Sequence, residues 1–270
     1  MITLYHGGAA ANSLKALLPL FEKNVDFKSH LMALVNFEQH EPWFVKINPL
    51  GQVPVLVHGD YVLNESTLIN EYVDDTFPGA PLKPSDAYGR HQMRLWTKFV
   101  DEYFCPALSF LGWHAMIKNA VAHLSKEEFE AKVARIPLKE QQDKWRESAA
   151  QQWTPEQLAD WRRKVKTSIE RVEKGMLGTW MMGDQYTLAD VSVFAMLIGM
   201  PLRYADIVND QDSPQVMAWY ARMQARDSVK KALAIGHPGA KFVQSQADHV
   251  TEPSPMPGAA PGFARHGRTI

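Results

Sequence analysis

The apolar positions of the first eighty residues change period several times, and each change marks a new element. Short apolar runs have the length and composition of β-strands at residues 2–5, 25–31, 55–57 and 61–63. Apolar residues recur at helical spacing over residues 14–21 and again over 68–77. The turn sequence His-Gly-Asp at residues 58–60 joins two of the runs. The pattern therefore predicts strand, helix, strand, then a β-hairpin and a helix that begins near Ser66.

From residue 87 onward the periodicity is helical. One apolar stripe, spaced by three and four residues, marks the buried face of a long helix: Met93, Trp96, Val100, Tyr103, Ala107 and Leu111. Pro106 falls within that stripe and is expected to kink the helix, because proline removes a backbone donor and clashes with the preceding turn. A second stripe predicts another buried helix face: Leu158, Trp161, Val165, Ile169, Val172 and Met176.

Three further helix starts follow from capping-box spacing. Ser125, Thr154 and Thr187 are each followed, three residues later, by a Glu, Gln or Asp that can bond back to the cap. The box formed by Thr187 and Asp190 is the sharpest of the three, and we assign it a structural and not a catalytic role.

A proline-rich segment separates the two halves. Residues 78–86 contain three prolines, which neither a helix nor a central strand accommodates. We therefore expect a first domain at residues 1–79, a linker at 80–86 and a helical domain at 87–248. Residues 114–154 are longer than an ordinary connection, and they form either a lid over a cleft or a helical hairpin that only thickens the domain. Residues 249–270 are rich in Pro and Gly, as in a mobile tail or an extended strap.

Composition narrows the function classes. The chain has 270 residues, 46% hydrophobic and 22% charged, with a formal net charge of −1, which argues against nucleic acid or an anionic membrane as its main partner. It shows neither a membrane-spanning run nor a signal peptide, so we expect a cytoplasmic protein. The single cysteine, Cys105, excludes an internal disulfide and is expected to be an inert thiol in a helix. No Cys/His cluster has metal-ligand spacing, so no metal is expected.

The start of the helix near Ser66 carries the first candidate chemistry. A helix N-terminus offers unpaired N–H groups and partial positive charge, so Ser66 lies where a carboxylate would be held. Glu65 beside it can hold an ammonium, and the two together fit an α-amino acid head group. Alternatively, Asn64 or Ser66 merely caps the helix.

Two other segments suit a peptide ligand. If the Val53–Pro54 peptide were cis, Val53 would present its backbone N–H and C=O outward as an edge on which a short peptide could pair. A loop of small residues then brings Asn12 and Ser13 to the start of the first helix, where either residue could also serve only as its N-cap.

Val53-Pro54 followed by Glu65-Ser66, behind a first strand and Asn12-Ser13, resembles the glutathione site of the glutathione transferase superfamily. The resemblance implies an α+β fold, with an N-terminal thioredoxin-like domain before an all-α helical bundle domain. It also implies glutathione as cosubstrate and a homodimer. By the same resemblance, His40 and Gln52 would hold the glycine carboxylate of glutathione, a role that Gln39 could share.

A narrower resemblance covers the helical insert and the segments 11–15 and 36–40. These look like the bacterial glutathione-dependent β-etherases of lignin degradation, of the β(S)-selective type. The implied reaction is attack of the glutathione thiolate on the carbon β to the arene and α to a ketone, which expels a phenol. Ser13 and Asn12 would favour the thiolate. Candidate contacts to the aromatic substrate are Phe104, Leu108, Trp113, Gln141, Gln142 and Trp145.

Two other classes of function stay open from the sequence. The same glutathione site would serve a transferase with another electrophilic or peroxide substrate, because the second domain sets the substrate. It would also serve a glutathione-fold binding protein without turnover.

Overall fold

The structure of the protein is a computed structural model, and it describes residues 1–235. The N-terminal domain has a four-stranded sheet in the order β2-β1-β3-β4, in which only β1 and β2 are parallel. Its elements are β1 (Ile2–His6), α1 (Ala11–Glu22), β2 (Lys28–Leu31), η1 (Leu34–Asn36), η2 (Glu38–His40), α2 (Pro42–Ile47), β3 (Val55–His58), β4 (Tyr61–Leu63) and α3 (Ser66–Thr76). The expected thioredoxin-like arrangement of the first domain is confirmed.

Two details of that domain differ from the sequence-based expectation. The second strand begins at Lys28, because the apolar residues before it, Val25 and Phe27, pack against the main core outside the sheet. The hairpin turn is also shorter than predicted, since His58 pairs with Tyr61 and only Gly59 and Asp60 lie between the strands. Gly59 has φ 58, a conformation that glycine adopts without steric cost.

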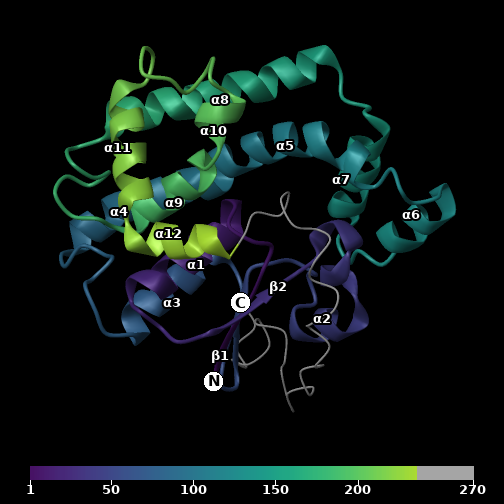
Figure 1. Cartoon of the computed structure of the whole chain (residues 1–270), viewed down its shortest axis with the longest axis horizontal. Coiled ribbons are helices and arrows are strands. Elements are labelled where there is room, and N and C mark those ends of the chain that lie inside the picture. Colours follow the sequence, from purple (N-terminus) through teal and green to yellow (C-terminus); the bar gives the residue numbers. More distant parts are fainter. Residues whose placement is uncertain (236–270) are drawn as a thin grey trace.

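The second domain is helical, and its helices lie together above the sheet in Figure 1. Its elements are α4 (Ala87–Phe99), η3 (Val100–Phe104), α5 (Cys105–Ala120), α6 (Lys126–Val133), α7 (Lys139–Ala150), α8 (Pro155–Gly175), α9 (Leu188–Leu197), α10 (Met200–Arg203), α11 (Pro214–Ala225) and α12 (Asp227–Ala234). The expected tail at residues 249–270 lies outside the described residues. Within residues 1–235, no helix combines the length and the apolar character needed to cross a membrane.

All three predicted capping boxes are present. Ser125, Thr154 and Thr187 each bond to the helix start, with the reciprocal bond from the third helical residue. The Thr187 box is also tied into the core, because Asp190 accepts from the backbone N–H of Met181 at 2.8 Å and from the Trp219 indole at 2.9 Å. Helix α9 is buried at every residue, so this box anchors the centre of the helical domain.

The predicted long helix is interrupted just before Pro106. Residues Val100–Phe104 form a π-helical segment between α4 and α5. A π-turn contains one residue more than an α-turn, and the extra residue rotates the following side chains around the helix. The predicted stripe is therefore wrong at Tyr103, which is 36% exposed, whereas Phe104 is fully buried.

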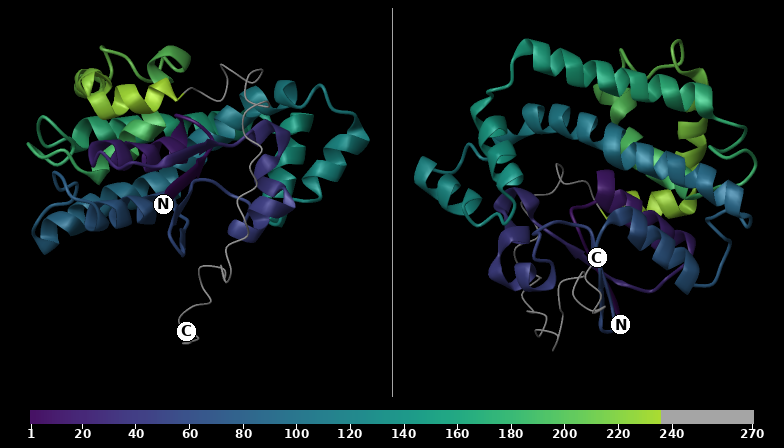
Figure 2. Two further views of the ribbon diagram at one scale, coloured as in Figure 1. Left: turned by 60° about the horizontal axis from the view of Figure 1, so that its bottom comes forward. Right: turned by 180° about the vertical axis from the view of Figure 1, so that it is seen from behind.

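The insert that follows α5 packs onto the N-terminal domain. Helices α6 and α7 project from one end of the helical domain and lie beside α2 and its preceding segment (Figures 1 and 2). Phe37, in a left-handed conformation with φ 65, places its ring 4.3 Å from that of Trp145. Arg135 and Glu41 form an ion pair at 3.0 Å across the same contact. The insert thus shares a small apolar core with the first domain.

That core also joins the insert helices to one another. It is built around buried Phe37 with Ile117, Val121, Val133, Ile136 and Trp145. Five of its six buried side chains come from residues 117–145, so the segment folds around an apolar centre separate from the main core. The insert therefore contacts the first domain as well as the helical one, and its role as a lid over a cleft stays a prediction.

Candidate functional site

The loop before α1 holds Ser13 in a fixed position. Ser13 is buried, and its hydroxyl oxygen accepts a hydrogen bond from the backbone N–H of Gly7 at 2.8 Å. His6 fixes the same loop, because its Nδ1 accepts from Gly8 at 3.0 Å while Nε2 lies 2.7 Å from the Ser29 hydroxyl. Burial lowers the pKa of His6 to about 4, so the ring is neutral at pH 7 and keeps Nδ1 as an acceptor.

Neither Asn12 nor Ser13 caps α1. The N-cap residue is Ala10, and no side chain among residues 1–235 caps the helix start. The capping alternative for this pair is therefore wrong, because both residues lie inside the first helical turn. The Asn12 amide points to the helical domain, where its nitrogen lies 3.7 Å from the Cys105 sulfur. Burial raises the pKa of the Cys105 thiol, which agrees with the expectation of an inert thiol.

The start of α3 has the features of an anion site. Glu65 occupies the N-cap position with φ 64, and the buried Ser66 is the first helical residue. No side chain of the described residues caps this helix, so the alternative that Asn64 or Ser66 only caps it is also wrong. The first-turn N–H groups and the Ser66 hydroxyl remain directed to this end of the helix, where partial positive charge favours a carboxylate. The Glu65 side chain is exposed beside them.

A buried lysine connects the starts of α1 and α3. Lys15 is fully buried, and its ammonium donates to the Thr67 hydroxyl at 2.8 Å and to the Asp101 carboxylate. Thr67 in turn donates to Asp101 at 2.6 Å. Because Lys15 lies two residues after Ser13 and Thr67 directly follows Ser66, this cluster fixes the two candidate serines on adjoining helices. Its charges cancel, because the Lys15 ammonium is paired with the Asp101 carboxylate, so the cluster contributes position and the helix starts contribute the partial positive charge.

This cluster is not apparent from the motifs in the sequence. The signal was present as a lysine within an otherwise apolar helix, between Leu14 and Ala16. A lysine at such a position is buried with the rest of the helix and requires a carboxylate partner. That partner, Asp101, lies 86 residues away in sequence and is not identifiable by spacing.

The segment before β3 places the other expected glutathione contacts. The Val53–Pro54 peptide is cis. The carbonyl of Gln52 accepts from the Asn48 side chain at 2.8 Å, which fixes the chain just before Val53. Pro54 is buried, while Gln52 and Val53 are partly exposed at the surface of the domain.

Gln39 and His40 are buried together in η2. The Gln39 amide nitrogen lies 3.2 Å from His40 Nε2, and Gly51 packs so closely that a Cβ there would meet His40 Nδ1 at 2.6 Å. Gly51 therefore brings the Gln52 segment against this pair. Burial, and then the charge of Arg135, lowers the pKa of His40 to about 4, so its ring is neutral at pH 7 and can offer a hydrogen bond but no charge.

The expected substrate contacts fall into two groups. Phe104 is fully buried in the main core and stacks on Phe99 at 6.2 Å, so its contact with substrate stays a prediction that the burial does not favour. Trp145 is also enclosed, with 4% exposure. Gln142 donates to the Ile136 carbonyl at 2.8 Å, so its amide already has a partner within the insert. Leu108, Trp113 and Gln141 are partly exposed, and their contact with substrate stays a prediction.

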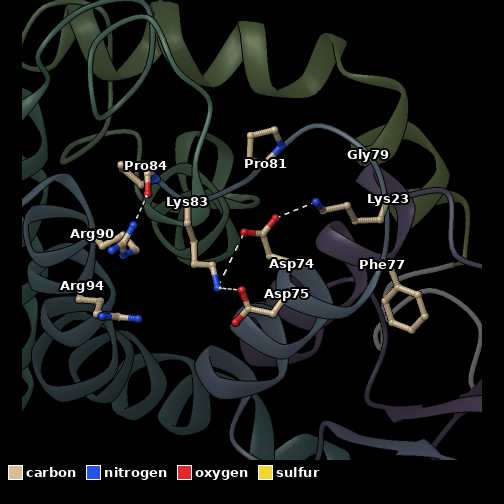
Figure 3. Close-up of a pocket in the computed structure, with 10 residues that line it drawn as sticks. All are labelled: Lys23, Asp74, Asp75, Phe77, Gly79, Pro81, Lys83, Pro84, Arg90 and Arg94. Carbon is tan, nitrogen blue, oxygen red and sulfur yellow. Dashed lines mark hydrogen bonds and ion pairs between the residues drawn. The ribbon is translucent and has the colours of Figure 1, made fainter. Parts of the chain in front are cut away.

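A cavity of about 490 Å³ lies away from these residues, at the opposite end of α3 (Figure 3). It is lined by ion pairs such as Lys23–Asp74 at 2.7 Å and Lys83–Asp75 at 2.6 Å. Its lining contains none of the expected glutathione contacts. Of its two arginines, Arg94 pairs with Glu71 at 2.6 Å and Arg90 donates to backbone carbonyls. In the part of the chain that the structure describes, no three His, Cys, Asp or Glu side chains are arranged to hold a metal ion.

The N-terminal domain is thioredoxin-like, carries two converging helix N-termini and lies next to an all-helical domain. Comparison with known protein families identifies the class of protein that has this arrangement. The family model of the glutathione S-transferase N-terminal domain matches residues 1–75, and that of the C-terminal domain matches residues 127–235. The chain belongs to the glutathione S-transferase family.

Within that family, one similar protein is Protein LigF of Sphingobium sp. strain SYK-6. It is 41% identical over 238 residues, which cover 85% of this chain and 92% of LigF. The crystal structure of the beta-etherase LigF superposes with a TM-score of 0.84 at 40% identity, over 87% of this chain and 99% of that one.

More distant relatives share the fold. Glutathione S-transferase 3 of Zea mays is 25% identical over 86% of this chain and 93% of its own length. A glutathione transferase family member of Pseudomonas fluorescens Pf-5, crystallised with two glutathione bound, has a TM-score of 0.66 at 20% identity over 87% of this chain and 93% of that one.

Proposed function

We propose that this protein is a glutathione-dependent β-etherase that cleaves β-aryl ether bonds in lignin-derived α-keto aromatic dimers. The observation that carries the proposal is the similarity to the beta-etherase LigF, which extends over 92% of that protein and therefore includes the insert as well as the first domain. The convergent starts of α1 and α3 supply the second support, since they suit a ligand with one anionic sulfur and one carboxylate.

In the proposed complex, glutathione lies along the Val53 edge of the first domain. Ser66 and the first N–H groups of α3 hold the carboxylate of its γ-glutamyl end, and the exposed Glu65 carboxylate holds the ammonium. Gln52, Gln39 and His40 lie at the other end of the same edge. His40 and Gln39 would bind the glycine carboxylate as neutral hydrogen-bond donors.

This placement directs the glutathione sulfur to the start of α1. A free thiol has a pKa of about 8.5, so catalysis requires a site that favours the thiolate. The Ser13 hydroxyl, fixed by Gly7, can donate to that sulfur while its lone pair accepts from the loop. The Asn12 amide lies on the same turn, and the partial charge of the helix start adds to the effect.

The thiolate attacks the carbon that bears the aryl ether. A C–S bond forms, the C–O bond breaks, and the electron pair leaves on the phenoxide, which becomes a phenol after protonation. The neighbouring ketone activates this carbon, so no nucleophile from the protein is required. Leu108, Trp113 and Gln141 on α5 and α7 are the partly exposed residues from which we expect the walls of the substrate pocket.

The proposal is tested by incubating the protein with glutathione and each enantiomer of an α-keto β-aryl ether. We expect release of phenol and formation of a glutathione thioether from the β(S) enantiomer. Conjugation of simple halides without ether cleavage would instead identify a transferase of another specificity. Glutathione binding without turnover of either substrate would identify a binding protein.

We also propose a homodimer and a cytoplasmic location, together with the domain limits 1–79 and 87–248. The exposed apolar side chains Leu68 on α3 and Leu95 on α4, at 63% and 43% exposure, give a surface that a second copy can cover. Sedimentation analysis tests the dimer, and Leu68→Glu is expected to shift it to monomer.

A further inference from the structure

A lysine of the insert extends its ammonium to the face of α5 that leads to the α1 start. Lys144 lies on α7, and its Nζ donates to the Ser109 hydroxyl of α5 at 2.8 Å. The same nitrogen lies 4.4 Å from the ring centre of Trp113 and 4.8 Å from that of Phe110. Two aromatic faces and one hydroxyl hold the ammonium in place.

This ammonium has no carboxylate partner in residues 1–235. Three acidic groups near it bond elsewhere: Glu130 of α6 pairs with Arg146, Asp143 pairs with Lys139, and Glu147 accepts from the Trp153 indole. Glu140, one turn before Lys144 on α7, is exposed to solvent. The titratable group of α5 that acts on Lys144 is the Cys105 thiol. A partly buried cation without a counter-ion lowers the folding stability of a protein. Its presence here therefore marks Lys144 as a candidate functional residue.

The position of Lys144 connects it to the expected site of reaction. Ser109 and Cys105 are one helical turn apart on α5, so their side chains lie on one face, with about 5–6 Å between Cβ atoms. Cys105 in turn contacts the Asn12 amide at 3.7 Å, at the helix start to which the glutathione sulfur is directed. If the substrate approaches the sulfur along this face of α5, its aryl leaving group lies next to the Lys144 ammonium.

We propose that the Lys144 ammonium protonates the departing phenoxide, which makes it a catalytic residue of the ether cleavage on which this inference rests. As the C–O bond breaks, the ether oxygen takes the electron pair and then a proton from Nζ. The neutral amine regains a proton from solvent, which has already received the proton of the glutathione thiol. The sum is glutathione plus ether giving thioether plus phenol.

The acidity of the group suits this step. Burial lowers the pKa of Lys144 to about 8, whereas an ordinary phenol has a pKa of about 10. The transfer is therefore downhill, and the ammonium is still mostly protonated at neutral pH. As pH rises through about 8, the donor loses its proton, so the rate with a poor leaving group is expected to fall there.

The experiment compares single-turnover rates over a series of α-keto β-aryl ethers whose phenols differ in acidity. Lys144→Met keeps an unbranched apolar side chain and removes the ammonium group that would donate the proton. We expect a loss of about 10²-fold with the ether of an ordinary phenol, and almost none with the ether of 4-nitrophenol, whose anion leaves without help. The high-pH decline is expected to disappear from the profile of the variant.

Two further variants separate proton transfer from charge and from structure. Lys144→Arg keeps the positive charge but cannot give up its proton, because the pKa of a guanidinium is far above neutral, so we expect it to behave as Lys144→Met. Lys118→Met, which changes an exposed lysine of α5, is the matched control and is expected to keep wild-type rates for every ether. Glutathione affinity and the denaturation midpoint of Lys144→Met are measured beside the rates.

Four outcomes would overturn the inference. An equal loss over all leaving groups would indicate a structural role for Lys144, and full activity of Lys144→Arg would indicate a role of charge alone. If wild-type protein cleaves the ethers and Lys144→Met matches it throughout, only the role of Lys144 is wrong. If wild-type protein binds glutathione and cleaves no ether, the proposed function fails, and the role of Lys144 fails with it.

Discussion

The Ser13 hydroxyl has two separable tasks, and Ser13→Ala removes both. Its oxygen accepts from the Gly7 N–H at 2.8 Å, and no acceptor for its hydrogen lies within bonding distance in the described part of the chain. The first task is structural. Without the hydroxyl, the buried Gly7 donor loses its acceptor, which costs about 1–3 kcal/mol of folding free energy.

The second task is the stabilisation of the bound thiolate. A hydrogen bond to a charged group contributes about 1.5–3 kcal/mol. At about 1.4 kcal/mol for each pKa unit, its loss is expected to raise the pKa of bound glutathione by about 1–2 units. At neutral pH the rate of the thiolate reaction is then expected to fall by about 10- to 100-fold, and to recover in part as pH rises.

Titration of the protein–glutathione complex by the ultraviolet absorbance of thiolate measures the second effect directly, and urea denaturation measures the first. Ser168→Ala is the control, because it also removes a buried serine hydroxyl, bonded to the Lys164 carbonyl at 2.8 Å, but on α8 away from the site. An unchanged thiol pKa in Ser13→Ala, with the expected loss of stability, would refute the catalytic task and leave only the structural one.

Three other predictions concern the site and the fold. Ser66→Ala is expected to weaken glutathione binding by about tenfold in calorimetry, since the carboxylate loses one hydrogen bond; unchanged affinity would contradict the placement. Asp190→Ala leaves the Met181 and Trp219 donors without acceptors and should lower the unfolding free energy by at least about 3 kcal/mol, measured by urea denaturation. The pKa values of His6 and His40 are lowered to about 4 in the folded protein. As pH drops from about 6.5 towards 4, the imidazoles are protonated in the unfolded protein but not in the folded one, so the free energy of unfolding should fall. The loss should approach about 3 kcal/mol for each histidine, and denaturation curves of equal midpoint at pH 7 and pH 4.5 would refute it.

Local chemistry made much of the fold predictable from the sequence. The capping boxes at Ser125, Thr154 and Thr187 formed as expected, because each depends on residues three apart. The hairpin and the start of α3 followed from short-range patterns in the same way. The family was recognisable because its motifs lie within the first eighty residues, in a fixed order.

Features that depend on distant contacts were not predictable. The burial of Lys15 makes sense only when α3 and the π-helical segment supply Thr67 and Asp101. Phe104 and not Tyr103 lies on the buried face, because the π-helical turn contains one extra residue. Apolar periodicity alone does not reveal that extra residue. Lys144 gave no signal in the sequence, because its neighbours Ser109 and Trp113 come from another helix.

The Phe37 ring, seated against Trp145, has a consequence for engineering. A chimera that transplants only residues 114–154 into a related transferase leaves behind the aromatic plug around which that segment closes. In a recipient with a small residue at the position of Phe37, the transplanted segment would have a cavity in its core and would pack poorly. To exchange specificity between such enzymes, two segments must therefore be transplanted together: the insert and the short loop that carries Phe37.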